Sequence, residues 1–258
     1  MSFKVKDEGS RATVYIYGAI GEDYWDPESA TRAREFSQLL DGLSPKPVDI
    51  RIDSCGGDVY EGFAIASAIQ RYEGETAAHI DGIAASAASY IALSADRVAM
   101  NDFAWIMIHN AWTFASGNRD DLRAAAEQLE GVDASIAKII SARSSLSPEE
   151  VAEAMAAETW YTAEDAERAG MCDEIVETSG RVEARIDGRV AARFRNMPQG
   201  VFAEGNPDDR GGAGAAEGAA ITPEDGSSHT EATIEDKEGG EPGTAFVIGS
   251  RVFTRKEK

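Results

Sequence analysis

The chain has 258 residues, of which 46 are Asp or Glu and 25 are Lys or Arg, so its formal net charge is −21. This acidic balance argues against nucleic acid or an anionic membrane surface as a main partner, because both need concentrated positive charge. Two cysteines and three histidines are too few for a disulfide framework or a structural zinc site, and charges among the first eight residues exclude a signal peptide. The longest uncharged runs, 82–95 and 103–118, are too short and too polar to span a bilayer. We therefore expect a cytoplasmic protein of a reducing compartment, to which we assign no metal and no cofactor.

The first 180 residues alternate between segments typical of strands and segments typical of helices. Clusters of β-branched and aromatic residues predict strands at 14–17, 48–53, 76–80, 97–100, 105–109 and 173–177. Apolar residues at helical spacing predict helices at 28–43, at 59–72, from about 84, and at 118–142. Two further helices begin at the capping sequences Ser147-x-x-Glu150 and Thr162-x-x-Asp165. This alternation predicts an α/β fold with a largely parallel sheet covered by helices.

Composition divides the chain into four segments. Residues 203–243 contain 9 of the 25 glycines and 11 acids against two bases, which gives this stretch a charge of −9. Such a stretch cannot bury enough apolar surface to offset its ordering entropy, so we expect a disordered acidic linker. We assign the folded domain to 1–180, its C-terminal extension to 181–202, the linker to 203–243, and a short apolar and basic segment to 244–258. That last segment is either a docking segment or a frayed terminus.

Three places combine a turn or a strand end with a group that can do chemistry. Asp53–Asp58 contains paired glycines whose backbone N–H groups could face an oxyanion, although a plain tight turn also explains them. Ser86 lies where a strand leads into a helix of small residues, with tight helix packing as the alternative explanation. His109 ends an apolar strand, where a purely structural role is the alternative.

The order and spacing of these places are more specific than any one of them. Paired glycines, a serine about 30 residues later, and Met107-Ile108-His109 about 23 residues after that resemble the caseinolytic protease ClpP family. The resemblance runs from about residue 14 to 176 and includes the Gly82–Ser86 stretch and Thr162-Ala163 followed by Gly170. Glu158-Thr159-Trp160 ahead of Tyr161 makes the chain most similar to the head-maturation (prohead) proteases of tailed phages and prophages.

The resemblance implies a serine endopeptidase on a ClpP/crotonase-like fold. It makes Ser86 the nucleophile and His109 the general base, with the backbone N–H groups of Gly57 and Ala87 as the oxyanion hole. It also implies that the helix at 118–142 protrudes as a handle through which the subunits of a homo-oligomeric ring pack.

Two positions depart from the family pattern. Cys55 stands where the family usually has Pro, which a turn tolerates. Where the family places the acid of the triad, this chain has Ala156, and the nearest acids are Glu153 and Glu158. We take Glu158 as the third triad member, because its side chain could reach His109. A Ser-His dyad is the alternative, and loss of the orienting acid can lower the rate by about four orders of magnitude.

We therefore expect an endopeptidase that processes phage capsid and scaffold proteins, in the host cytoplasm or in the prohead. Its expected partners are a protein or peptide substrate and copies of itself. An ATPase partner is not favoured, because only about ten residues precede the first strand. Two alternatives stay open. The missing Asp and the acidic tail favour a catalytically weak ClpP-like assembly or scaffold protein, and a crotonase-type acyl-CoA enzyme would leave Ser86 and His109 without a role.

Overall fold

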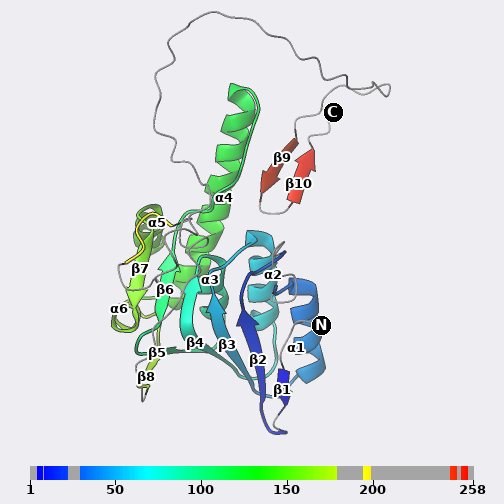
Figure 1. Ribbon diagram of the computed structural model, residues 1–258, viewed down its shortest axis with the longest axis vertical. Helices are drawn as coiled ribbons and strands as arrows, with labels where there is room; N and C mark the ends of the chain where they lie inside the picture. Colours follow the sequence, from blue (N-terminus) through cyan, green and yellow to red (C-terminus); the bar gives the residue numbers. More distant parts are fainter. Residues whose placement is uncertain are drawn as a thin grey trace, which may run out of the picture.

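The computed structural model describes residues 5–7, 9–22, 30–178 and 194–198, together with two strands at 245–248 and 251–254. A mixed, mostly parallel sheet forms the centre of the molecule, and helices cover one of its faces (Figure 1). The strands of this sheet are β1 (Val5–Asp7), β2 (Ala12–Tyr17), β3 (Val48–Ser54), β4 (Thr76–Ala85), β5 (Arg97–Asn101), β6 (Trp105–Ile108), β7 (Thr159–Thr162) and β8 (Glu174–Val176). The helices are α1 (Ala33–Leu43), α2 (Val59–Gln70), α3 (Ala87–Ala92), α4 (Arg119–Arg143), α5 (Pro148–Ala156) and α6 (Ala163–Arg168).

The strand order brings the carboxyl ends of β3, β4 and β6 together. The main path is β1-β2-β3-β4-β5-β8, and β6 pairs with β4 and with β7. The pairings β2–β3, β3–β4, β4–β5, β4–β6 and β5–β8 are parallel, whereas β1–β2 and β6–β7 are antiparallel. Residues that follow β3, β4 and β6 therefore lie at one edge of the sheet, where α/β proteins commonly place their sites.

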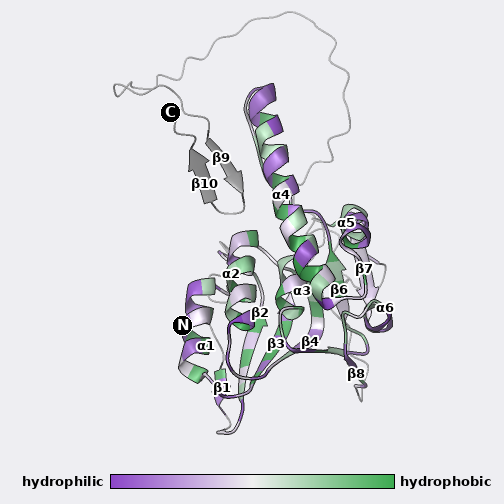
Figure 2. Ribbon diagram, turned by 180° about the vertical axis from the view of Figure 1, so that it is seen from behind, coloured by the Kyte–Doolittle hydropathy of each residue, from purple (hydrophilic) through white to green (hydrophobic). Residues whose placement is uncertain are grey.

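The core lies between the sheet and helices α1 to α3. Alternate residues of β2, β3 and β4 are fully buried and their neighbours are partly exposed, as expected of strands covered on one face. The buried set packs with Phe36 and Leu40 of α1 and with Ile65 and Ile69 of α2. Burying a side chain of this size contributes about 1.5–3 kcal/mol to stability, before entropy losses. Figure 2 shows the same pattern in the hydropathy of the strands and helices.

The expected α/β class and the largely parallel sheet are confirmed, but several boundaries were wrong. The first helix begins at Ala33 rather than at residue 28, because Thr31 forms a bridge with Ile20. Strand β4 continues to Ala85, and α3 starts only at Ala87, because 83–85 pair with β6. The short strands β1 and β7 were not predicted.

Helix α4 is the longest described helix and projects beyond the sheet (Figure 1). It begins within a residue of the expected position, where Asn118 and Asp121 form a capping box. Most of its buried residues, from Val132 to Ile140, lie in the second half, which packs against α5 and α3. Leu122 in the first half stays exposed.

The expected linker at 203–243 lies outside the described residues, and so does the extension at 181–202 apart from 194–198. Within the expected terminal segment, β9 (Ala245–Ile248) and β10 (Arg251–Thr254) form an antiparallel pair. Within the described part of the chain, no helix combines the length and apolar character that a membrane crossing requires. The same residues bring together no group of three or more His, Cys, Asp or Glu side chains suited to a metal ion.

Candidate active site

Ser86 occupies a strained turn between β4 and α3. Its backbone has φ 55° and ψ −122°, a conformation that residues other than glycine rarely adopt. The turn is held because the Ser86 N–H donates to the carbonyl of Met107 on β6, at 2.9 Å. The hydroxyl does not cap the helix that follows it, so it is free to interact with a group beyond the turn.

That group is His109, whose Nε2 lies 2.8 Å from the Ser86 Oγ. The parallel register pairs Ala85 with Met107, so the residues that follow β4 and β6 emerge side by side. Two backbone hydrogen bonds fix the chain after the histidine. The Asn110 N–H donates to the Met155 carbonyl at 3.2 Å, and the Ala111 N–H donates to the Asp133 carboxylate of α4 at 2.7 Å.

The surroundings of His109 keep its imidazole neutral near pH 7. Burial lowers its pKa below the usual value, the negative charge of Glu158 raises it, and the positive charge of Arg195 lowers it again. A neutral ring within hydrogen-bond distance of a hydroxyl can accept the proton of that hydroxyl. The pair can therefore generate an oxygen nucleophile at physiological pH.

The paired glycines lie directly against the serine turn. Gly56 has φ 88°, and a Cβ placed there would lie 2.7 Å from the Ala85 carbonyl oxygen and 2.8 Å from the Ala87 nitrogen. Bonds from Ile20 N–H to the Gly56 carbonyl and from Asp58 N–H to the Ile20 carbonyl hold the turn in place. Among the described residues, the N–H groups of Gly57 and Ala87 donate to no acceptor. Two unengaged N–H groups beside a serine can stabilise an oxyanion.

Glu158 lies close enough to His109 to influence its charge, but no hydrogen bond joins the two side chains. It follows the end of α5 with φ 51°, a position that usually holds glycine, and it is only 4% exposed. Its Oε1 accepts a hydrogen bond of 2.7 Å from the backbone N–H of Asn196. The structure thus places Glu158 beside the pair as an electrostatic neighbour, whereas Glu153 lies one turn back in α5.

An apolar cluster adjoins the serine, and sequence reasoning missed part of it. Ile83, Ala85 and Met107 form its buried centre. The partly buried residues packed against them are Cys55, Trp105, Trp160, Phe194 and Met197. Nothing in the local pattern of the last two residues indicates this placement, because their contacts are with residues far away in the sequence.

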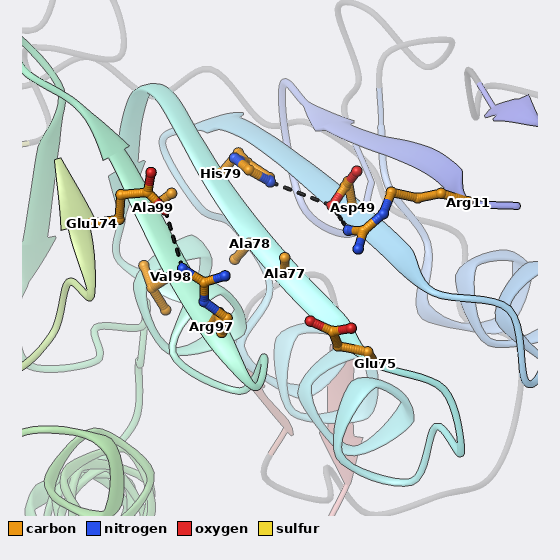
Figure 3. A pocket seen from close by; sticks show the side chains of 10 residues that line it. All are labelled: Arg11, Asp49, Glu75, Ala77, Ala78, His79, Arg97, Val98, Ala99 and Glu174. Atoms are coloured by element: carbon orange, nitrogen blue, oxygen red, sulfur yellow. Dashed lines mark hydrogen bonds and ion pairs between the residues drawn. The ribbon is translucent and has the colours of Figure 1, made fainter. Parts of the chain in front are cut away.

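A charged pocket of about 240 Å³ lies elsewhere, on the open face of the sheet (Figure 3). Its lining comes mainly from the amino-terminal halves of β3, β4 and β5, away from the carboxyl ends that carry Ser86 and His109. Within it, Asp49 lies 2.5 Å from Arg11 and 3.4 Å from His79, and Arg97 lies 3.1 Å from Glu174. These side chains neutralise one another, and the pocket holds none of the groups described above.

Comparisons with known proteins show which family this chain resembles in sequence and fold. A family model described as Clp protease matches residues 27–179. An ATP-dependent Clp protease proteolytic subunit of Bacteroides fragilis is 29% identical over 140 residues, which cover 53% of this chain and 68% of the relative. A proteolytic subunit 3 of Streptomyces coelicolor, also named as ATP-dependent, is 27% identical over 176 residues, covering 67% and 78%. A mutant ClpP1 structure from Listeria monocytogenes shares the fold, with a TM-score of 0.54 and 24% identity over 65% of this chain and 92% of that one.

Proposed function

This chain belongs to the Clp protease family and is therefore a serine-type peptidase, and we propose that it is an endopeptidase that forms an acyl-enzyme on Ser86. The observation that carries the proposal is the 2.8 Å contact between the Ser86 Oγ and the His109 Nε2. The strained backbone of Ser86 and the adjacent glycine turn support it, because such turns present a nucleophile to an incoming carbonyl.

The proposed reaction proceeds in two steps. His109 takes the hydroxyl proton as the Ser86 oxygen attacks the carbonyl carbon of the scissile bond, and the N–H groups of Gly57 and Ala87 stabilise the resulting oxyanion. The imidazolium then gives its proton to the leaving amine, and the C–N bond breaks. Water, deprotonated by the same ring, hydrolyses the ester and restores Ser86. In both steps the negative charge of Glu158 favours the imidazolium that forms.

We further propose that the protein works as a homo-oligomer on phage capsid or scaffold proteins. The long projecting helix α4 supports the oligomer, as do the exposed apolar side chains of Trp112, Phe114 and Leu122 near its start. The Glu158–Ala163 sequence, which resembles that of head-maturation proteases, supports the substrate class. Cleavage of purified scaffold protein at defined bonds, with an unrelated unfolded protein left intact, is the expected result.

A fluorophosphonate probe tests the nucleophile directly. We expect the probe to label Ser86, located by mass spectrometry, and His109→Ala to slow labelling by about three orders of magnitude or more. The matched control is Ser94→Ala, because the Ser94 hydroxyl, just after α3, donates to the Tyr90 carbonyl within that helix, and labelling should persist. A folded sample without labelling at Ser86 contradicts the peptidase and favours an assembly role, whereas acyl-CoA binding with unlabelled Ser86 favours a crotonase-type enzyme.

A further inference from the structure

The short segment 194–198 is attached to the turn that carries Glu158. The Asn196 backbone N–H donates to the Glu158 Oε1, and the Asn196 Nδ2 donates to the Ala157 carbonyl, both at 2.7 Å. In Figure 1 this segment runs beside α5. It lies beyond residue 179, where the match to the Clp protease family model ends, so the family pattern does not account for it.

The same segment also contacts the histidine. The Phe194 ring meets the His109 ring edge to face, with centroids 6.0 Å apart, and meets the Trp160 ring at 5.5 Å. Met197 packs in the apolar cluster beside Ser86. Five consecutive residues therefore touch both the imidazole and the turn of the nearby carboxylate.

Glu158 needs an external support to keep its position. Its positive φ is a strained conformation for a residue with a side chain, and it persists only where the surroundings enforce it. Its carboxylate is buried, and a buried charge without a hydrogen bond would turn toward water. Among the described residues, the hydrogen bond that this carboxylate receives comes from Asn196.

We propose that segment 194–198 is a working part of the active site, in which Asn196 is a positioning residue that holds the Glu158 carboxylate beside His109. The proposal rests on the proposed function, because a positioning role has meaning only if Ser86 and His109 react. It makes residues downstream of the family match necessary for full reactivity of the serine.

Because of the charges around His109, the proposed role of Asn196 predicts a distinctive change in the pKa of His109. Glu158 raises the pKa of His109, and Arg195 of the same segment lowers it, against the larger lowering by burial. If Asn196 acts by holding Glu158, removing its side chain breaks the bond to the Ala157 carbonyl that fixes the Asn196 backbone N–H against the carboxylate, so the support for the imidazolium weakens and the pKa of His109 falls. If the side chain only keeps the segment packed, its removal lets water reach the ring, and the pKa rises instead.

The test follows the rate at which a fluorophosphonate probe labels Ser86 in the full chain, as a function of pH. Wild type should show an acid limb with its midpoint below 6.5, the usual value for histidine. Asn196→Ala should lower the plateau rate about tenfold to hundredfold and move the midpoint to lower pH, because the backbone N–H that donates to Glu158 loses its anchor on Ala157 while Phe194 and Met197 still shield the ring from water. Glu158→Gln should do the same, and the double variant should be no slower than Glu158→Gln alone, because the two residues act through one carboxylate.

Asn101→Ala is the matched control. The Asn101 Nδ2 donates to the Asp81 carbonyl at 2.8 Å, a bond of the same kind on the open face of the sheet, and its loss should leave labelling unchanged. Additive losses in the double variant, a midpoint that rises in Asn196→Ala, or an unchanged rate in that variant would each overturn the positioning role while wild-type labelling still supports the peptidase. Absence of labelling in wild type would instead overturn the proposed function itself.

Discussion

At the scale of single residues, backbone strain singles out the same groups as the chemistry. Among the described residues, Ser86 and Glu158 are the two residues other than glycine that have a positive φ. Each such conformation costs about 1–3 kcal/mol and survives only where its neighbours enforce it. For Ser86 the neighbours are Met107, which accepts its N–H, and Gly56, whose backbone lies against the turn. The strain thus presents the hydroxyl to His109 instead of to the helix that follows it.

Gly56→Ala should therefore damage the site more than the fold. The added Cβ would overlap the Ala85 carbonyl oxygen, the Ala87 nitrogen and the Ser86 Cβ, so the turn must shift and carry the N–H of Ala87 with it. Loss of an oxyanion donor lowers kcat about 10²–10³-fold, and we expect a fall of that order in the rate of probe labelling or peptide cleavage. Gly131→Ala is the control, because a Cβ there meets nothing within 4 Å, and that variant should keep its rate. Equal labelling or cleavage rates in the two variants would show that the glycine turn does not contribute to the reaction.

The residues proposed as nucleophile and base could be predicted from the sequence, but the contact that holds Glu158 could not. Ser86 and His109 each follow a strand of a predicted parallel sheet, so their proximity follows from the topology, and the structure places them together. Glu158 and Asn196 meet through a contact that spans 38 residues. Such a contact has no local signal, because tertiary packing alone brings the two residues together.

At the scale of elements, pairing overrides local preference near the site. The run of small residues from Gly82 favours a helix from about residue 84, yet Ile83 to Ala85 pair with Trp105 to Met107, and β4 continues to Ala85 instead of ending at residue 80. The helices that begin at capping boxes, in contrast, start where the sequence predicts, because a cap is a local interaction. Boundaries that are set by pairing with a neighbouring strand were therefore predicted wrongly by a few residues, whereas helix starts that are set by a local cap were predicted correctly.

Ser147→Ala tests the contribution of such a cap. The Ser147 hydroxyl accepts from the Glu150 N–H at 3.2 Å, and the Glu150 carboxylate accepts from the Ser147 N–H at 2.8 Å. Loss of the hydroxyl should lower the free energy of unfolding by about 1 kcal/mol, which corresponds to about 2–4 °C in Tm for a domain of this size. Ser135→Ala, in the interior of α4, should raise Tm slightly because alanine is the better helix former. If Ser147→Ala has the same Tm as Ser135→Ala, the capping box contributes nothing to stability.

At the scale of the whole molecule, charge and exposed apolar surface act in opposite directions on assembly. Each chain carries a net charge of −21, so copies repel one another at low ionic strength. Phe114 is 78% exposed, and its ring meets that of exposed Trp112 edge to face at 5.4 Å, just before α4 begins. Apolar side chains so exposed near a projecting helix are typical of a surface that another chain covers.

Association should therefore strengthen as salt is added, because the screening length falls from about 10 Å at 0.1 M to about 3 Å at 1 M while apolar contacts persist. Sedimentation velocity in about 0.05 M and about 0.5 M sodium chloride measures the fraction of associated chains. We expect a larger fraction at the higher concentration, where the repulsion between chains is screened. Phe114→Ser should weaken association at both concentrations, whereas Val176→Ser, which removes a partly exposed apolar side chain from edge strand β8, should associate as wild type does. A chain that stays monomeric at both concentrations contradicts the oligomer, and association that weakens with salt would mean that contacts between opposite charges hold the subunits together.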